Sequence, residues 1–106
     1  MMIDINKAVK IFDALSDKTR LRIFIILLKG KLCVCELMDI LNMKQSRISH
    51  CMKILKNAEL VDSYREGKWI IYTISPEINK NGIIKGVKNE LKIQTKGKSN
   101  FKKCKK

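Results

Sequence analysis

The stretch VCELMDILNMKQSRISHCMKIL, residues 34–55, decides the fold. Its apolar residues recur at helical spacing in two short runs, which predict one helix over residues 34–42 and a second over residues 45–58. The apolar positions are Leu37, Ile40 and Leu41 in the first run and Ile48, Met52 and Leu55 in the second. Two short helices joined by a tight turn are typical of a helix-turn-helix unit.

The hydrophobic period changes immediately downstream of these helices. Residues 60–64 and 69–74 are rich in β-branched and aromatic residues, which favour strands. They flank residues 65–68, where Gly67 permits a tight turn. The segment is therefore predicted to be a β-hairpin, which beside a helix-turn-helix would form a wing.

Further helices are predicted on both sides of this unit. Residues 4–15 carry one apolar stripe, and a second, deeply buried helix begins after the cap signal at Asp17 and ends at Gly30. Pro76 favours the first turn of a final helix, expected over about residues 77–93.

The predicted element order, ααααββα, is that of a winged helix-turn-helix fold, which is mainly α with a β-hairpin. A chain of 106 residues has room for one core. We assign residues 1–93 to a winged helix-turn-helix DNA-binding domain and residues 94–106 to a lysine-rich tail that we expect to be flexible.

The chain is strongly basic, with a formal net charge of +13 and a pI near 9.8. Such a field attracts polyanions, and nucleic acid is the leading candidate. Residues 85–106 contain nine lysines against one glutamate and carry +8 of the total. A lysine run of this kind can also serve solubility alone.

Residues 1–10, the apolar runs and the four cysteines bear on the cellular compartment of the protein. No secretory leader is visible in residues 1–10, and the longest apolar run, residues 23–28, is too short to span a bilayer. We therefore expect a cytoplasmic protein, away from membranes, in which the four cysteines are kept reduced. Reduced, clustered thiols point to ligand binding or redox sensing rather than to a disulfide framework.

The polar face of the helix predicted over residues 45–58 is the expected DNA-reading surface. Gln and Arg near the N-terminus of such a helix can make bidentate contacts to base edges, and Ser hydroxyls suit phosphates. Basic side chains at the hairpin tip could reach the adjacent groove or backbone. The candidate DNA-binding residues are Gln45, Ser46, Arg47, Ser49, His50 and Lys53 on the helix and Arg65 and Lys68 in the hairpin.

Cys33 and Cys35 are the candidate ligand-binding residues, at the start of the helix predicted over residues 34–42. On a regular helix, side chains two positions apart point about 200° apart. Both sulfurs could then bind one small ion only if the first turn distorts, and a disulfide between them is disfavoured. We expect ligand capture to unwind this helix, which should pack against the DNA-reading helix.

The chemistry of the thiol pair limits the choice of ion. Two or three thiolates without a histidine or carboxylate cluster favour a soft thiophile over magnesium, calcium or manganese. Trivalent arsenic or antimony, As(III) or Sb(III), fits a pyramidal sulfur site, whereas tetrahedral zinc or cadmium wants four ligands. No organic cofactor is expected. The simpler alternative is that both cysteines are ordinary core residues.

Four segments of the chain carry a resemblance: LSDKTRLRI (15–23), LCVCEL (32–37), QSRISH (45–50) and GKWIIY (67–72). Together they resemble the ArsR/SmtB family, and within it the arsenic-responsive repressors most. The match runs in unbroken order over about residues 8–78. The resemblance implies a homodimer built from the first and last helices, an operator of dyad symmetry, and relief of repression when arsenite or antimonite binds the cysteines.

The chain departs from the family pattern in three places. Met38 stands where such repressors often carry a third cysteine, so a third sulfur would have to come from Cys51 or Cys104. Cys51 lies beside the apolar stripe and is expected to pack rather than to bind. Glu59 stands where the family usually has Gly, which would strain that turn. The histidine and carboxylate pattern of zinc-sensing relatives is absent from the last helix, which disfavours zinc, cadmium or lead.

Two other functions stay open at this point. A repressor of the same fold could sense oxidants or reactive sulfur species through the same cysteines. A constitutive architectural DNA-binding protein would use no ligand and would show little sequence preference. An enzyme is not expected, because the chain has one histidine, no plausible acid–base pair and no Gly-rich phosphate loop.

Overall fold

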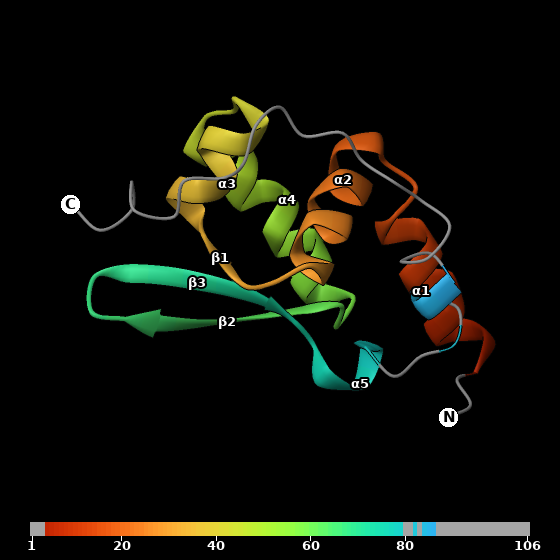
Figure 1. The fold of residues 1–106 in the computed structure, drawn as a ribbon. Coiled ribbons are helices and arrows are strands. Elements are labelled where there is room, and N and C mark those ends of the chain that lie inside the picture. Colours follow the sequence, from red (N-terminus) through yellow and green to blue (C-terminus); the bar gives the residue numbers. More distant parts are fainter. Residues whose placement is uncertain (1–3, 80–81, 83, 87–106) are drawn as a thin grey trace.

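The structure, a computed structural model, describes residues 4–79, 82 and 84–86. Its elements in chain order are α1 (Ile5–Ala14), α2 (Lys18–Leu28), β1 (Leu32–Cys33), α3 (Val34–Leu41), α4 (Gln45–Asn57), β2 (Val61–Glu66), β3 (Trp69–Ile74) and α5 (Pro76–Asn79). The helix-turn-helix (α3 and α4) and the hairpin (β2 and β3) are confirmed close to their predicted bounds (Figure 1). The last helix begins at Pro76, as predicted, while residues 80, 81, 83 and 87–93 of the expected helix lie outside the described residues.

Short-range chemistry sets where the helices begin and end. The side chain of Asp4 accepts a hydrogen bond from the backbone N–H of Lys7 at 2.8 Å and caps α1. Asp17 caps α2 in the same way, through the N–H of Arg20 at 3.1 Å. Asn42 ends α3 in the left-handed conformation, with φ of 55°. These caps explain why the polar breaks in the sequence coincide with the helix ends.

The three strands form one antiparallel sheet in the order β1-β3-β2, and α2, α3 and α4 cover one of its faces (Figure 1). Gly67, with φ of 60°, makes the turn between β2 and β3. This turn lies at the end of the molecule opposite α1. The hairpin is therefore a wing that projects beyond the helical part of the fold.

Strand β1 was not predicted, and the ααααββα order is corrected accordingly. Its two residues, Leu32 and Cys33, pair with Tyr72 and Ile71 of β3. A two-residue strand is too short to show the period of two that identifies strands in sequence. It exists because the end of the α2–α3 connection meets the wing.

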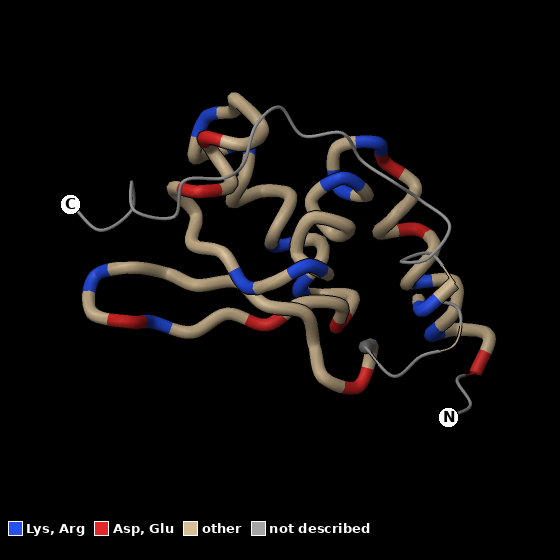
Figure 2. Tube along the Cα trace, in the orientation of Figure 1, with Lys and Arg blue, Asp and Glu red and all other residues tan. Residues whose placement is uncertain are grey.

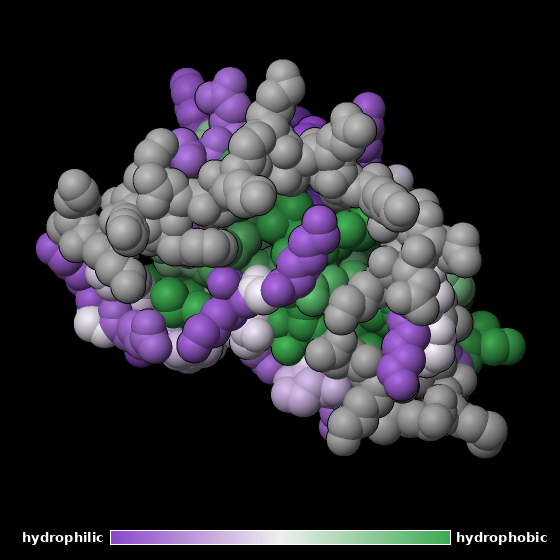
Figure 3. Space-filling model, viewed as in Figure 1, coloured by the Kyte–Doolittle hydropathy of each residue, from purple (hydrophilic) through white to green (hydrophobic). Residues whose placement is uncertain are grey.

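The main core lies between the helices and one face of the sheet. Phe24, Leu37 and Leu55 are fully buried there together with Val61 of β2, and Ile74 of β3 is buried beside them. On the face shown in Figure 3, hydrophobic residues reach the surface in the middle of the view and again at its right-hand edge. The helical spacing in the sequence therefore predicted the core correctly on α4, whereas the apolar stripe predicted over residues 4–15 is partly exposed.

The longest described helix, α4, has 13 residues. No helix within residues 4–79, 82 and 84–86 is both long and apolar enough to cross a bilayer. The proposed tail, residues 94–106, lies outside the part of the chain that the structure describes.

Candidate DNA-reading surface and thiol site

Helix α4 presents the predicted polar face to solvent. Its apolar positions Ile48, Met52 and Leu55 are buried in the main core, which fixes the rotation of the helix. All six candidate DNA-binding residues are exposed as a consequence: Gln45, Ser46, Arg47, Ser49, His50 and Lys53. The surface can therefore offer amide, guanidinium, hydroxyl and ammonium groups to a nucleic acid.

The wing tip carries the other two candidates. Arg65 lies near the end of β2, Lys68 lies in the turn, and both are exposed. Figure 2 shows that basic and acidic positions lie close together at the far end of the hairpin. The ammonium of Lys68 lies 5.8 Å from the centre of the Trp69 ring, at cation–π distance. The wing tip thus holds a cation that is positioned by an aromatic side chain.

The thiol pair lies at a junction between strand and helix rather than inside a helix. Cys33 has an extended backbone (φ −86°, ψ 167°), ends β1 and is the N-cap residue of α3, whereas Cys35 is in the first turn of α3. The prediction that two helical positions hold the sulfurs about 200° apart is therefore wrong. Cys33 is outside the helix because its backbone pairs with β3.

The register of the sheet assigns the thiols to a particular face. Cys33 pairs with Ile71, and directly paired residues project on the same side of a sheet. Cys33 and Ile71 form a small buried cluster, against which Cys35 and Trp69 pack. This thiol cluster is separate from the main core, to which Leu32, the neighbour of Cys33, belongs. Cys33 therefore lies on the sheet face that points away from the main core, and Cys35 packs against it.

Glu36 is a further residue of the site that the sequence reading missed. Among the described residues, Glu36 is the one charged residue that is buried, with 6% of its surface exposed. Its Oε1 accepts a hydrogen bond from the backbone N–H of Cys33 at 2.9 Å. A signal was present, because Glu three positions after an N-cap is half of a capping box. The signal was hidden because Cys33 replaces the usual Ser or Thr.

The redox state of the cysteines differs from the expectation that all four are thiols. Cys35 and Cys51 are free, whereas Cys33 is disulfide-bonded. Because Cys35 is free, no disulfide joins it to Cys33, as predicted. Ligand binding through both members of the pair therefore concerns the reduced chain.

Cys51 does not join the thiol cluster. Its side chain is 5% exposed and belongs to the main core, and burial raises the pKa of its thiol. The structure therefore places Cys51 as a packing residue, while Cys104 lies outside the described residues. Within the described ranges, no three residues of the types His, Cys, Asp and Glu are grouped to hold a metal ion.

Helix α1 carries an apolar stripe that the main core does not cover. Ile5, Val9 and Phe12 are 80%, 58% and 54% exposed, although Ile11 and Ala14 on the other side of the helix are buried. The first three residues follow helical spacing and share one face. An exposed apolar stripe at the end of the molecule is suited to contact with another protein surface.

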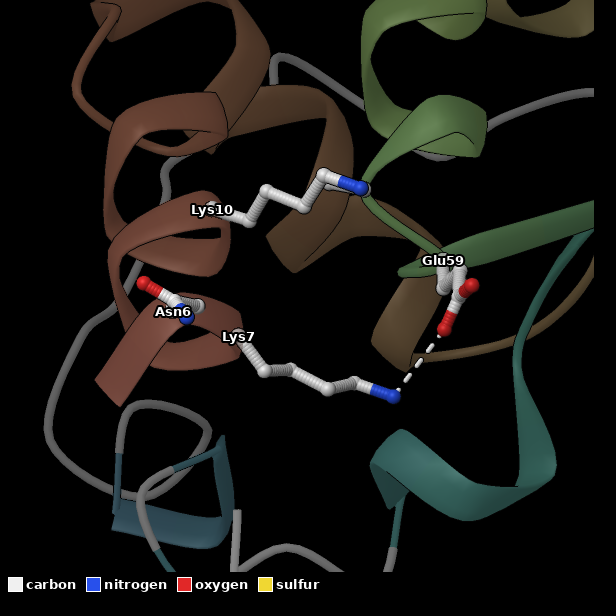
Figure 4. Close-up of a pocket in the computed structure, with 5 residues that line it drawn as sticks. Asn6, Lys7, Lys10 and Glu59 are labelled. Carbon is white, nitrogen blue, oxygen red and sulfur yellow. Dashed lines mark hydrogen bonds and ion pairs between the residues drawn. The ribbon is translucent and has the colours of Figure 1, made fainter. Parts of the chain in front are cut away.

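The turn after α4 contains the predicted departure at Glu59. This residue has φ of 63°, and the N–H groups of Glu59 and Leu60 bond back to Lys56 and Leu55, which is the Schellman arrangement that favours glycine. Its carboxylate forms an ion pair with Lys7 of α1 at 3.0 Å (Figure 4). The hydrogen bond from Lys7 lowers the pKa of Glu59, and Glu59 raises the pKa of Lys7 in return.

Comparison with known proteins finds similarity to bacterial transcriptional regulators. Residues 17–63 match the family model described as "Bacterial regulatory protein, arsR family". The chain is 33% identical to the cadmium resistance transcriptional regulatory protein CadC homolog of Staphylococcus aureus, over 83% of this chain and 74% of that protein. It is 39% identical to the arsenical resistance operon repressor of Bacillus subtilis, over 69% of this chain and 70% of that protein.

A solved structure is similar over most of the chain. HlyU from Vibrio cholerae superposes with a TM-score of 0.73 and is 30% identical, and the match covers 85% of this chain and 98% of that one.

Proposed function

The chain belongs to the ArsR family of bacterial regulatory proteins, and on that premise we propose that it is a repressor that leaves its operator when arsenite or antimonite binds Cys33 and Cys35. Members of this family are DNA-binding transcriptional regulators and not enzymes. The choice of inducer and of the residues that bind it is our proposal.

One observation carries the proposal. Cys33 and Cys35 come together at the β1–α3 junction in a small apolar cluster with Ile71 and Trp69, apart from the main core. If the cysteines served only as packing residues, they would be expected in the main core, where Cys51 lies. Two sulfurs in apolar surroundings suit a soft, thiophilic ligand.

The donor set fits a metalloid better than a tetrahedral metal ion. Arsenite, As(OH)3, exchanges two hydroxyls for two cysteine sulfurs: two As–O bonds break, two As–S bonds form and two waters leave, without oxidation or reduction. Tetrahedral zinc or cadmium would need further ligands. The nearby carboxylate of Glu36 already accepts the hydrogen bond from the Cys33 backbone.

The DNA-binding half of the proposal uses α4 and the wing. Arg47 and Gln45 would read base edges in the major groove, while Lys53, Arg65 and Lys68 would bind phosphates or the adjacent groove. The remaining candidates on α4 are Ser46, Ser49 and His50. The exposure of these residues supports this role.

We also propose that the operator-binding form is a homodimer. The apolar stripe of α1, formed by Ile5, Val9 and Phe12, supplies a surface that a second copy could cover. In a two-fold dimer this contact is self-complementary and would present two α4 helices to two half-sites. This agrees with the family resemblance, which implies pairing through the first and last helices.

The test is a titration of the reduced full-length protein on a labelled fragment of its own promoter. Arsenite, antimonite, zinc and cadmium are added separately. We expect arsenite and antimonite to weaken DNA binding by roughly 5- to 150-fold, the usual range of allosteric coupling. Release by zinc or cadmium alone, or only after addition of an oxidant, would overturn the proposed inducer.

A further inference from the structure

We propose that the thiol pair controls the wing, so that inducer binding detaches β1 from β3 and disturbs Lys68 through Trp69. This inference rests on the proposed function and deepens it by naming the element that moves. The sequence alone pointed to the DNA-reading helix α4, through unwinding of α3. In the structure, Cys33 pairs directly with β3 of the wing, which is the other proposed DNA-binding element.

The first link is the strand pairing. Cys33 is itself a residue of β1 and is paired with Ile71 in the middle of β3. Cys35, two residues later, is in helix α3. A ligand atom bonded to both sulfurs must therefore bridge a strand and a helix, and it restrains the junction between them.

The second link is the packing of the thiol cluster. Cys35 and Trp69 both pack against Cys33 and Ile71. Trp69 is the first residue of β3 and directly follows the wing turn. The ammonium of Lys68 lies 5.8 Å from the centre of the Trp69 ring. A change in the volume or position of the sulfurs is thus passed to the wing tip through one aromatic side chain.

A third contact joins the same two elements. The ammonium of Lys31, the residue before β1, lies 5.7 Å from the centre of the Tyr64 ring in β2. Tyr64 pairs with Ile71 and therefore projects on the same sheet face as the thiol cluster. The segment from residue 31 to residue 33 consequently contacts both strands of the wing.

The pairing of β1 is the weakest part of the sheet. Two residue pairs join β1 to β3, whereas six pairs join β2 to β3. Strain at the junction of Cys33 and Cys35 should therefore release β1 before it opens the hairpin. The wing would then stay a hairpin but lose its fixed orientation relative to α3 and α4.

Hydrogen–deuterium exchange of the reduced full chain, with and without arsenite, locates the change. Arsenite should increase exchange in peptides covering residues 31–33 and 69–74, while α4 keeps its protection. Increased exchange confined to α3 and α4, with the wing peptides unaltered, would overturn the inference.

A variant tests the route through Trp69. The quantity measured is the ratio of DNA affinities without and with arsenite, so that any direct effect of the substitution on DNA binding cancels. Trp69→Leu should lower this ratio from the roughly 5- to 150-fold range of the parent toward one. The control is Ile70→Leu, a substitution of the next residue on the opposite sheet face, which should keep the parental ratio. An unchanged ratio in Trp69→Leu would contradict the route.

Arsenite binding is measured separately for each protein, which distinguishes the two proposals. If the reduced parent bound no arsenite, the proposed function would fail and the inference with it. If Trp69→Leu bound arsenite and left DNA as the parent does, only the wing connection would be wrong. Binding of arsenite by Trp69→Leu with retention of DNA supports both.

Discussion

The carboxylate of Glu36 accepts a hydrogen bond from the backbone N–H of Cys33 at 2.9 Å, in a buried position. This bond satisfies a donor at the N-terminus of α3, and it holds Cys33 in the extended conformation that lets it pair with β3. The position of one of the two proposed ligand-binding sulfurs therefore depends on the next acidic residue in the sequence.

Replacing Glu36 by Ala should destabilise the protein by about 1–2 kcal/mol, because a buried cap is lost. Chemical denaturation of the reduced protein measures this loss. Glu36→Gln is the matched control, since its amide oxygen can still accept the hydrogen bond. This variant should lose less stability than Glu36→Ala. Equal stability of the parent and Glu36→Ala would mean that the bond does not hold the junction.

Replacing Arg47 by Ala should reduce affinity for the operator more than affinity for unrelated DNA, because a side chain that reads base edges is lost at a cost of about 1–3 kcal/mol. Fluorescence anisotropy with the promoter and with a scrambled duplex measures both affinities. Lys53→Ala should instead reduce the affinity for both duplexes by a similar factor, as expected when a phosphate contact is lost. If Arg47→Ala kept the parental preference, another residue would read the operator.

Replacing Phe12 by Ser should weaken dimerisation at least about tenfold, because burial of one Phe side chain contributes about 1.5–3 kcal/mol. Sedimentation equilibrium gives the dimer dissociation constant. Lys10→Ser changes an exposed residue of the same helix away from the apolar stripe and should leave the constant unchanged. A monomeric parent, or a Phe12→Ser variant that dimerises normally, would exclude α1 from the interface.

The ion pair of Lys7 and Glu59 should be visible in the titration of Glu59. Because Lys7 lowers the pKa of this carboxyl in the folded state, the pair stabilises the fold above the ordinary glutamate pKa and loses this effect as the pH falls through the lowered value. Nuclear magnetic resonance of the side-chain carboxyl should give a midpoint below that of an isolated glutamate, and Lys7→Met should raise it. Identical midpoints in the two proteins would show that the contact is not populated.

Much of the fold followed from periodicity in the sequence. The change from helical spacing to β-branched and aromatic residues after residue 60 predicted α4 and the hairpin, because these elements are long enough to show their own periods. The left-handed turn at Glu59 was anticipated from the family resemblance, because the family usually has Gly at this position.

The geometry of the thiol site could not be predicted in the same way. Cys33 becomes a strand residue only because β3 lies beside it, and pairing between segments almost forty residues apart has no local signature. The face on which Cys33 lies depends on the register of the sheet, because a shift of one residue would turn its side chain toward the main core. The sequence therefore sufficed to propose Cys33 and Cys35 as candidates, whereas the pairing of Cys33 with a strand of the wing could not be predicted.

The most direct test compares arsenite-induced release from promoter DNA for the reduced parent, a Cys33→Ser/Cys35→Ser variant and Cys51→Ala as the matched control. The parent and Cys51→Ala should leave the DNA on addition of arsenite, whereas the double variant should remain bound at every arsenite concentration. Release of the double variant at the parental concentration would contradict the assignment of Cys33 and Cys35 as the inducer site.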